Sequence, residues 1–136
     1  MITDLEAQRG LDKLKRSGFE SLSGPEKTLV TVWLFDAGVS NGGFKHYYES
    51  AAGDTAFHAP AALHDIGATQ LAEIAAAANA VFGPAGPAKE KQTRTAVTES
   101  MGESAEAEWE ALEVTFFECP EDVDDLLEAY LEPAKP

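Results

Sequence analysis

The stretch Trp33–Asp54, WLFDAGVSNGGFKHYYESAAGD, determines how the rest of the chain is organised. It ends an apolar helix, turns on two glycines and begins a second helix with aromatic residues. Six of the seven residues in Leu29–Phe35 are apolar, and a helix with so little polar surface belongs in the middle of a domain. Ser23 and Glu26 have capping-box spacing, and Pro25 suits a first helical turn. A buried strand is the alternative for so short a run, but the cap and the lack of a partner strand favour a helix.

The turn at Ser40–Phe44 has two interpretations. In the structural one, Gly42 and Gly43 adopt backbone angles closed to other residues, and Asn41 caps the following helix. In the functional one, free N–H groups at the start of that helix hold an anion or a carboxylate. Because short turns between helices are common, the structural interpretation is favoured. The apolar face of the following helix would consist of Phe44, Tyr47, Tyr48 and Ala51.

The remaining segments also predict helices, and none alternates polar and apolar residues for long enough to indicate a strand. We therefore expect an all-α fold, a single compact domain over residues 1–136 with about six to eight helices. It would comprise an N-terminal helix (1–22), a helical core (23–82), a Gly/Pro loop with a polar helix (83–102), and an acidic helix pair (103–132).

Local patterns define the first half in more detail. A helix over residues 3–16 should begin at a Thr3 cap, use Leu5 and Leu14 as apolar positions, and be weakened by Gly10. The pair Gly53-Asp54 should break the chain. A short helix should then run from His58 through Ile66 and stop at Gly67.

In the second half, an alanine-rich helix is expected over residues 71–81 and a loop over 83–87. The next segment, 88–101, has helical composition but a thin apolar face, so we expect a mobile or partly exposed helix. That face would consist of Ala88, Thr95, Val97 and Met101. Pro120 separates the two acidic helices, and Pro133 ends the second.

The composition sets limits on class and compartment. A chain of 136 residues can bury a core without a disulfide or metal. Its single cysteine, Cys119, fits a reducing compartment, and its acidic neighbours should raise the thiol pKa. The N-terminus does not resemble a signal peptide, and the longest nearly apolar run, Leu71–Phe82, is too short to span a bilayer. These features predict a cytoplasmic protein.

The charge is concentrated at one end of the sequence. Of the 24 acidic residues, 13 lie between Glu99 and Glu132, where there is no lysine or arginine. The remaining 11 acidic and 10 basic residues nearly balance, so this segment supplies 13 of the 14 net negative charges. Binding to nucleic acid or to an anionic membrane is therefore disfavoured, and a basic protein partner is favoured.

The acidic residues of this segment recur at helical spacing. Like charges three or four residues apart each cost about 0.2–0.5 kcal/mol of helix stability. The pattern fits a solvated face, an adaptation to salt, or a docking surface for a basic partner. At a rise of ~1.5 Å per residue the segment carries roughly one charge per 4 Å of helix, close to the ~3.4 Å spacing along one DNA strand. The candidate partner-binding residues are Glu106, Glu110, Glu113, Glu121, Asp124, Asp125, Glu128 and Glu132.

The segment Leu29–Ala68 resembles the signature of a bacterial all-helical family named for its DNA-mimic protein. In that family a tryptophan-bearing helix runs into an Asn-Gly-Gly-Phe turn, an aromatic helix, and a helix ending in Ile-Gly-Ala. The match covers about 40 of the 136 residues. It is carried by Val32, Trp33, Asp36, Val39, Ser40, Asn41, Gly42, Gly43, Phe44, Tyr47, Tyr48, Gly53, Asp54, Ile66, Gly67 and Ala68.

The resemblance implies an all-α fold. For the member that names the family, it also implies a homodimer whose negative surface imitates duplex DNA and occupies the DNA-binding site of a transcription factor. The matching residues are typical of fold-forming positions, so they favour the fold more strongly than they favour DNA mimicry. No charged position can be matched one by one.

Enzymatic and other binding functions are the alternatives to a DNA-mimic role. The spacing of His46, His58 and His64 matches no metal-ligand pattern, and no catalytic or phosphate-binding motif is present. We therefore expect no enzyme activity, no catalytic residue, no metal and no cofactor. An inhibitor or immunity-type protein that neutralises a basic toxin or enzyme would use the same acidic face. An interaction module could instead use Asn41–Tyr48, with the acidity serving only solubility.

Overall fold

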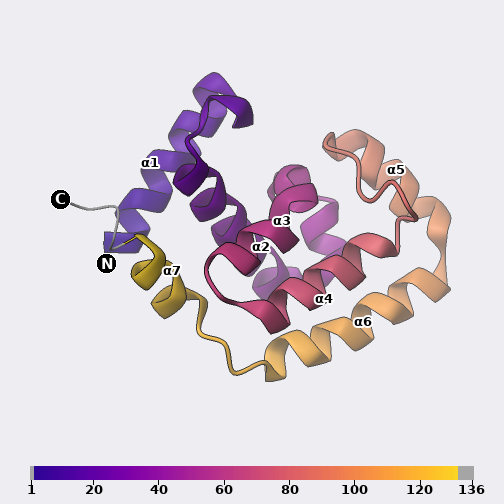
Figure 1. The fold of residues 1–136 in the computed structure, drawn as a ribbon. Coiled ribbons are helices and arrows are strands. Elements are labelled where there is room, and N and C mark those ends of the chain that lie inside the picture. The colour runs from indigo at the N-terminus through magenta and orange to yellow at the C-terminus, as the bar shows by residue number, and fades with distance from the viewer. Residues whose placement is uncertain (1, 132–136) are drawn as a thin grey trace.

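The computed structural model describes the backbone of residues 2–131 and the side chains of residues 5–131. Within this part, the chain forms seven α-helices and two 3-10 helices and has no strand (Figure 1). The prediction of a single all-α domain is confirmed. In order, the elements are α1 (Ile2–Ser17), η1 (Phe19–Ser21), α2 (Gly24–Tyr48), η2 (Ala51–His58), α3 (Ala59–Asp65), α4 (Thr69–Ala80), α5 (Lys91–Met101), α6 (Glu103–Glu118) and α7 (Val123–Leu131).

Helix α2 lies at the centre, as its apolar composition predicts. It begins with the expected capping box: Ser23 Oγ accepts from the Glu26 N–H at 3.2 Å, and Glu26 Oε1 accepts from the Ser23 N–H at 2.8 Å. Pro25 occupies the first turn. Helices α1, α3, α5, α6 and α7 and the 3-10 helix η2 all pack against α2.

The predicted turn at Ser40–Phe44 is a kink within α2. Only Gly43 leaves helical geometry (φ 82°, ψ −178°), whereas Gly42 has no positive φ. The expectation of unusual angles at both glycines was therefore wrong for Gly42. One residue in a glycine-only region is enough to redirect the backbone, after which helical bonding resumes through Tyr48.

Helix α1 packs on α2 through small residues. Ala7 and Gly10 are buried, and a Cβ at Gly10 would lie 2.7 Å from Val30 Cγ1. Gly10 therefore permits a close helix contact. The prediction for Leu5 was wrong, because its side chain is 56% exposed. The predicted Thr3 cap lies outside the described side chains.

The segment after α2 also differs from the prediction. Gly53 and Asp54 do not break the chain but lie inside η2, which leads directly into α3. Gly67, with φ 84°, follows the end of α3 as expected. Helix α4 and the loop over residues 83–87 are confirmed.

Helix α5 is attached through polar residues. Its buried positions are Arg94 and Thr98, while the predicted apolar residue Val97 is 37% exposed. The prediction was therefore wrong for Val97, whereas Met101 packs against the core, Ala88 and Thr95 are half-buried, and the expected partly exposed helix is confirmed. Because α5 has so few apolar side chains, hydrogen bonds and an ion pair hold it to the rest of the fold.

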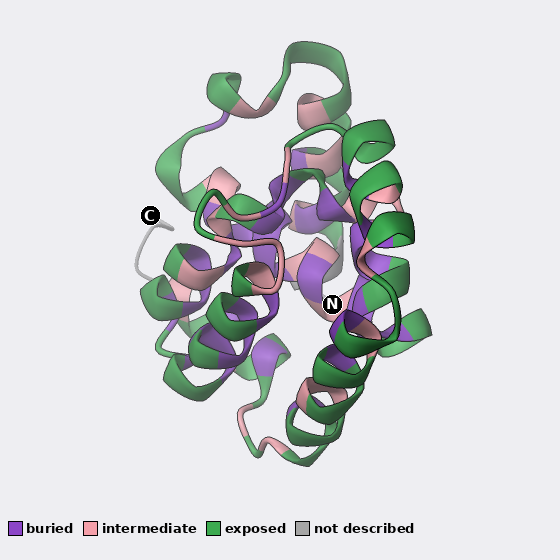
Figure 2. Ribbon diagram, turned by 90° about the vertical axis from the view of Figure 1, so that its right-hand side faces the viewer, coloured by how far each residue is buried: buried purple, intermediate pink, exposed green. Residues whose placement is uncertain are grey.

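The core is rich in aromatic residues. Phe35, Phe44 and Phe116 lie within ring contact of one another, and Tyr48 stacks on Trp109 with centroids 5.1 Å apart. Figure 2 shows the buried positions turned inward and the exposed ones outward. Helix α6 covers α2 and α4, and α7 returns to α1 and α2 (Figure 1). None of the described helices is long and apolar enough to cross a bilayer.

Candidate partner-binding surface

The two acidic helices lie at the outside of the molecule, joined by residues 119–122 (Figure 1). Helix α6 buries Ala105, Trp109 and Phe116 and exposes most of its carboxylates. The indole Nε1–H of Trp109 donates to the Ala78 carbonyl at 3.1 Å, which fixes α6 against α4. We call the following exposed acidic residues the acidic surface: Glu103, Glu108, Glu110, Glu118, Asp122, Asp124, Asp125 and Glu128.

Three predicted partner-binding residues of α6, Glu106, Glu110 and Glu113, differ in their surroundings: one faces solvent and two contact other parts of the chain. Glu110 is exposed, but Glu106 pairs with Lys45 at 3.7 Å. Glu113 Oε2 accepts from the backbone N–H of Phe44 at 2.8 Å. The Asn-Gly-Gly-Phe segment therefore does hold a carboxylate, as the functional interpretation of that turn allows, but the carboxylate comes from this same chain. We leave Glu113 out of the acidic surface.

Glu121 also has an intramolecular role. It lies before α7, and its carboxylate accepts from the N–H groups of Gln70 and Leu71 at 3.1 and 2.8 Å. These groups belong to the first turn of α4, where the helix dipole favours a negative charge. Glu121 therefore caps α4, and we leave it out of the acidic surface as well.

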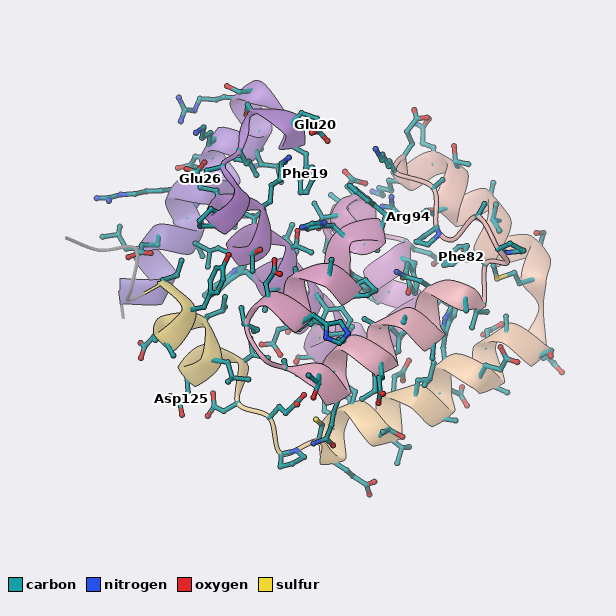
Figure 3. The ribbon with its side chains drawn as sticks, viewed as in Figure 1. Phe19, Glu20, Glu26, Phe82, Arg94 and Asp125 are labelled. Atoms are coloured by element: carbon teal, nitrogen blue, oxygen red, sulfur yellow. The ribbon has the colours of Figure 1, made fainter. Side chains whose placement is uncertain are left out.

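Helix α7 presents the other candidate residues. Asp124, Asp125 and Glu128 are exposed, and Asp125 points outward from α7 in Figure 3. Asp122 Oδ1 accepts from the Asp125 N–H at 3.1 Å and so caps this helix. The remaining candidate, Glu132, and the predicted stop at Pro133 lie outside the described residues.

A pocket of about 350 Å³ lies where α6 meets α7. It is lined by the carboxyl-bearing residues Asp36, Glu121, Asp122 and Asp124, together with Phe117, whose side chain is 61% exposed. Burial, and then the charges of Asp124 and Asp122, raise the pKa of Asp36. The acidic surface therefore includes a concavity in which negative charges repel one another.

The thiol of Cys119 lies in the connection beside this pocket. Partial burial, more than the nearby Glu121 charge, raises its pKa. The predicted direction is thus confirmed, although its main cause is burial.

The main interaction that sequence reasoning missed is made by Arg94, which is fully buried (Figure 3). Its guanidinium donates to the carbonyls of Tyr48, Ala88 and Ser50 at 2.7–2.9 Å and to Asp54 Oδ1 at 2.8 Å. These bonds fasten α5 to the end of α2 and to η2. The signal in the sequence was indirect: a helix with few apolar residues must be held by polar ones.

Several of the signature residues lie where α5 and α6 attach to the rest of the fold. A Cβ at Gly53 would lie 2.7 Å from the Tyr47 carbonyl and 3.0 Å from Arg94 Nε, so the absence of a side chain leaves room for the guanidinium. Phe44, Tyr47 and Tyr48 are buried, Trp33 packs at the edge of the core, and Asn41 and Gly42 are exposed. The aromatic residues of Asn41–Tyr48 therefore serve the core and are not available to a partner.

The family model for DMP19-like protein matches residues 20–134. The chain belongs to the DMP19-like family. Membership of this family fits a DNA-mimic role at the level of the family. No curated protein and no solved structure gives a significant match.

In this DMP19-like protein the three histidines differ in how far they are buried. His46 and His64 are exposed, whereas partial burial lowers the pKa of His58. Within the described part of the chain, no group of three or more His, Cys, Asp or Glu side chains could hold a metal ion.

Proposed function

We propose that this protein is a non-enzymatic binding protein whose acidic surface docks on a basic protein surface, in the manner of a DNA mimic. The partner would be a DNA-binding protein such as a transcription regulator. The observation that carries the proposal is the acidic surface itself: eight exposed carboxyl-bearing residues on or beside α6 and α7, in a segment that contains no lysine or arginine.

The arrangement of these residues supports a docking role. Glu113 and Glu121 are turned into the fold and Asp122 caps α7, yet all eight residues of the acidic surface, Asp122 included, remain exposed. Their mutual repulsion has an unfavourable energy that a basic partner would relieve. A lysine or arginine side chain inserted into the pocket beside Asp36 would likewise reduce the repulsion between the carboxylates that line it.

Apolar contact would add to the charge. Val114 and Phe117 are 58% and 61% exposed on the outer side of α6, among the acidic residues. Interfaces combine an apolar centre with a polar rim. A partner with a basic surface that also carries apolar groups fits this side of α6.

The proposal is tested by immobilising the protein and capturing partners from a lysate of the source organism at low salt. A triple variant, Glu110→Gln, Glu118→Gln and Asp125→Asn, removes three charges from the acidic surface. A matched control, Asp12→Asn, Glu20→Gln and Glu90→Gln, removes three charges elsewhere. We expect a DNA-binding protein that elutes with salt, is lost with the first variant but not with the control, and is displaced by duplex DNA.

Equal retention by both variants, or no captured protein, would overturn the proposal. A captured toxin or enzyme that duplex DNA does not displace would instead indicate an inhibitor that neutralises a basic target. The homodimer implied by the family resemblance is part of the proposal and is tested separately by sedimentation velocity over a range of concentrations.

A further inference from the structure

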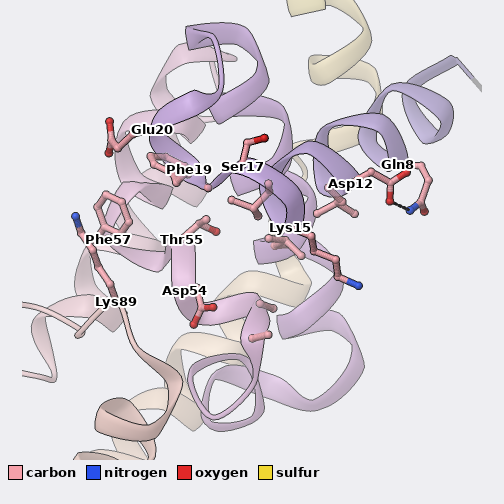
Figure 4. Close-up of a pocket in the computed structure, with 16 residues that line it drawn as sticks. Gln8, Asp12, Lys15, Ser17, Phe19, Glu20, Asp54, Thr55, Phe57 and Lys89 are labelled. Atoms are coloured by element: carbon pink, nitrogen blue, oxygen red, sulfur yellow. Dashed lines mark hydrogen bonds between the residues drawn. The ribbon is translucent and has the colours of Figure 1, made fainter.

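A second concave site lies on the side of α1 that faces η2. It has a volume of about 720 Å³, within the range of pockets that bind small molecules. It is formed by the second half of α1, residues 18–20, part of α2 and η2, and by Lys89 from the segment before α5 (Figure 4). Its apolar walls include Leu11, Leu14, Phe19, Leu34 and Phe57.

Thr55 supplies an unused polar group in this pocket. Thr55 is 2% exposed, and its hydroxyl has no hydrogen-bond partner among the described residues. A buried hydroxyl without a partner is unfavourable, since it has lost water and gained nothing. Figure 4 places Thr55 between Phe57 and Lys15, among the residues that line the pocket. A ligand that accepts a hydrogen bond would satisfy it.

The charges around the pocket favour an anion. Asp54 is bound to Arg94 at 2.8 Å, and Glu20 is paired with Lys27 at 3.2 Å. Lys15 and Lys89 line the pocket, and neither forms an ion pair within the described residues. The Lys89 ammonium lies 4.6 Å from the centre of the Phe57 ring.

One opposing charge remains at the pocket. It belongs to Asp12, which accepts from the Gln8 amide at 3.2 Å.

We propose that this pocket binds a small amphipathic carboxylate. Its hydrocarbon body lies against the leucine and phenylalanine side chains. Its carboxylate accepts from the Thr55 hydroxyl and is neutralised by Lys15 or Lys89. This site is separate from the acidic surface and does not depend on the function proposed for it.

The test uses the full chain and three probes with a ten-carbon chain: decanoate and decyltrimethylammonium below their micelle concentrations, and decanol below its solubility limit. Binding is followed by amide chemical shifts in nitrogen-15-labelled protein. Decanoate is expected to shift residues of α1 and η2 and to bind more tightly than decanol, while the cationic probe does not bind there. No decanoate binding, shifts confined to other elements, or equal binding of decanoate and the cation would each overturn the proposal.

Two isosteric variants separate binding from folding. Thr55→Val removes the hydroxyl in the pocket and is expected to weaken decanoate binding about tenfold. Thr31→Val removes another buried hydroxyl, which has no partner within residues 5–131 and lies in α2, away from the pocket lining. Neither change removes a hydrogen bond, so both variants should fold, and Thr31→Val should bind decanoate normally. Equal affinity in Thr55→Val and the wild type would overturn the assigned role of Thr55.

A charge variant tests the carboxylate head group. Lys15→Gln with Lys89→Gln changes two exposed side chains and should abolish the preference for decanoate over decanol. Survival of that preference would overturn the assigned anionic specificity.

Discussion

The Glu113 carboxylate lies 2.8 Å from the Phe44 backbone nitrogen, and the missing side chain at Gly43 makes this approach possible. A Cβ at Gly43 would lie 2.6 Å from Glu113 Oε2, and the backbone there has φ 82° and ψ −178°, a region that is essentially restricted to glycine. The glycine therefore serves both the kink of α2 and the attachment of α6.

Gly43→Ala should destabilise the fold by about 2–4 kcal/mol, because backbone strain and the collision with Glu113 act together. Glu113→Ala alone should cost about 1–2 kcal/mol through the unpaired Phe44 N–H. The double variant should be less destabilised than the sum of the two, since the collision is gone. Urea unfolding measures all three, and strictly additive values would contradict the coupling.

Arg94 should be among the most sensitive positions of the chain. Arg94→Met leaves three backbone carbonyls without their donor and should cost about 3–5 kcal/mol. Arg94→Lys keeps the charge but cannot reproduce the forked geometry, so it should also destabilise. Arg9→Met, at an exposed position, is the matched control and should change the free energy of unfolding by less than about 0.5 kcal/mol. Similar melting temperatures for Arg94→Met and Arg9→Met would refute this assignment.

These interactions show which parts of the fold were predictable. The capping box of α2 and the alanine-rich run of α4 are local, so they could be recognised from the sequence. Apart from the Arg94–Ala88 bond, which spans six positions, the bonds of Arg94, Glu113 and Glu121 join residues 40–69 positions apart. No local pattern indicates such pairs.

The same limit applies to the candidate site. The sequence predicted where the negative charge is concentrated. It did not distinguish Glu110, which is exposed, from Glu113 three residues later, because that distinction depends on which side of α6 faces α2.

The neighbouring tyrosines Tyr47 and Tyr48 should respond differently to loss of the hydroxyl. Both are buried, and burial raises both pKa values, so both stay neutral at ordinary pH. The Tyr48 hydroxyl donates to Asn79 Oδ1 at 2.6 Å, whereas the Tyr47 hydroxyl has no partner in the part of the chain that the structure describes. Tyr48→Phe should cost about 1–2 kcal/mol, and Tyr47→Phe should be neutral or slightly stabilising. Thermal unfolding of the pair measures the contrast; an equal loss in both would show that the Tyr47 hydroxyl is bonded.

Asp36 and Glu26 should give the free energy of unfolding opposite dependences on pH. Burial, and then Asp124 and Asp122, raise the pKa of Asp36 above its ordinary value of 3.8. Its ionisation is therefore harder in the folded state, and stability is lost as the pH rises through the folded pKa. Asp36→Asn should be more stable than wild type at pH 7, with the advantage vanishing below about pH 3.8.

The contribution of Glu26 to the free energy of unfolding depends on pH in the opposite direction. Hydrogen bonding from the Ser23 backbone, and then from Lys13, lowers its pKa below 4.5. It stabilises the fold above that pH, and the effect is lost as the pH falls through the folded pKa. Glu26→Gln should therefore be less stable than wild type at pH 7 and approach it in acid. Unfolding curves from pH 3 to 7 for both variants test the two signs, and parallel curves for Asp36→Asn and wild type would contradict the first.

The carboxylates of the acidic helices should divide into two classes by their effect on stability. Glu121→Gln weakens the cap on α4 and should lower the free energy of unfolding by about 1 kcal/mol, and part of this loss should persist at high salt because the two capping bonds are direct contacts. Neutralising Glu110, Glu118 and Asp125 removes mainly repulsion between exposed charges, which should exceed the favourable dipole interaction lost at Asp125 in the first turn of α7. That variant should be more stable than wild type at low salt, by a few tenths of a kcal/mol per charge, and equal to it at 1 M salt, where the screening length is about 3 Å. Chemical denaturation in urea, which adds no ions, measures both. If neutralising the exposed residues lowered stability, these carboxylates would stabilise the fold. Their exposure would then no longer support a role in binding a partner.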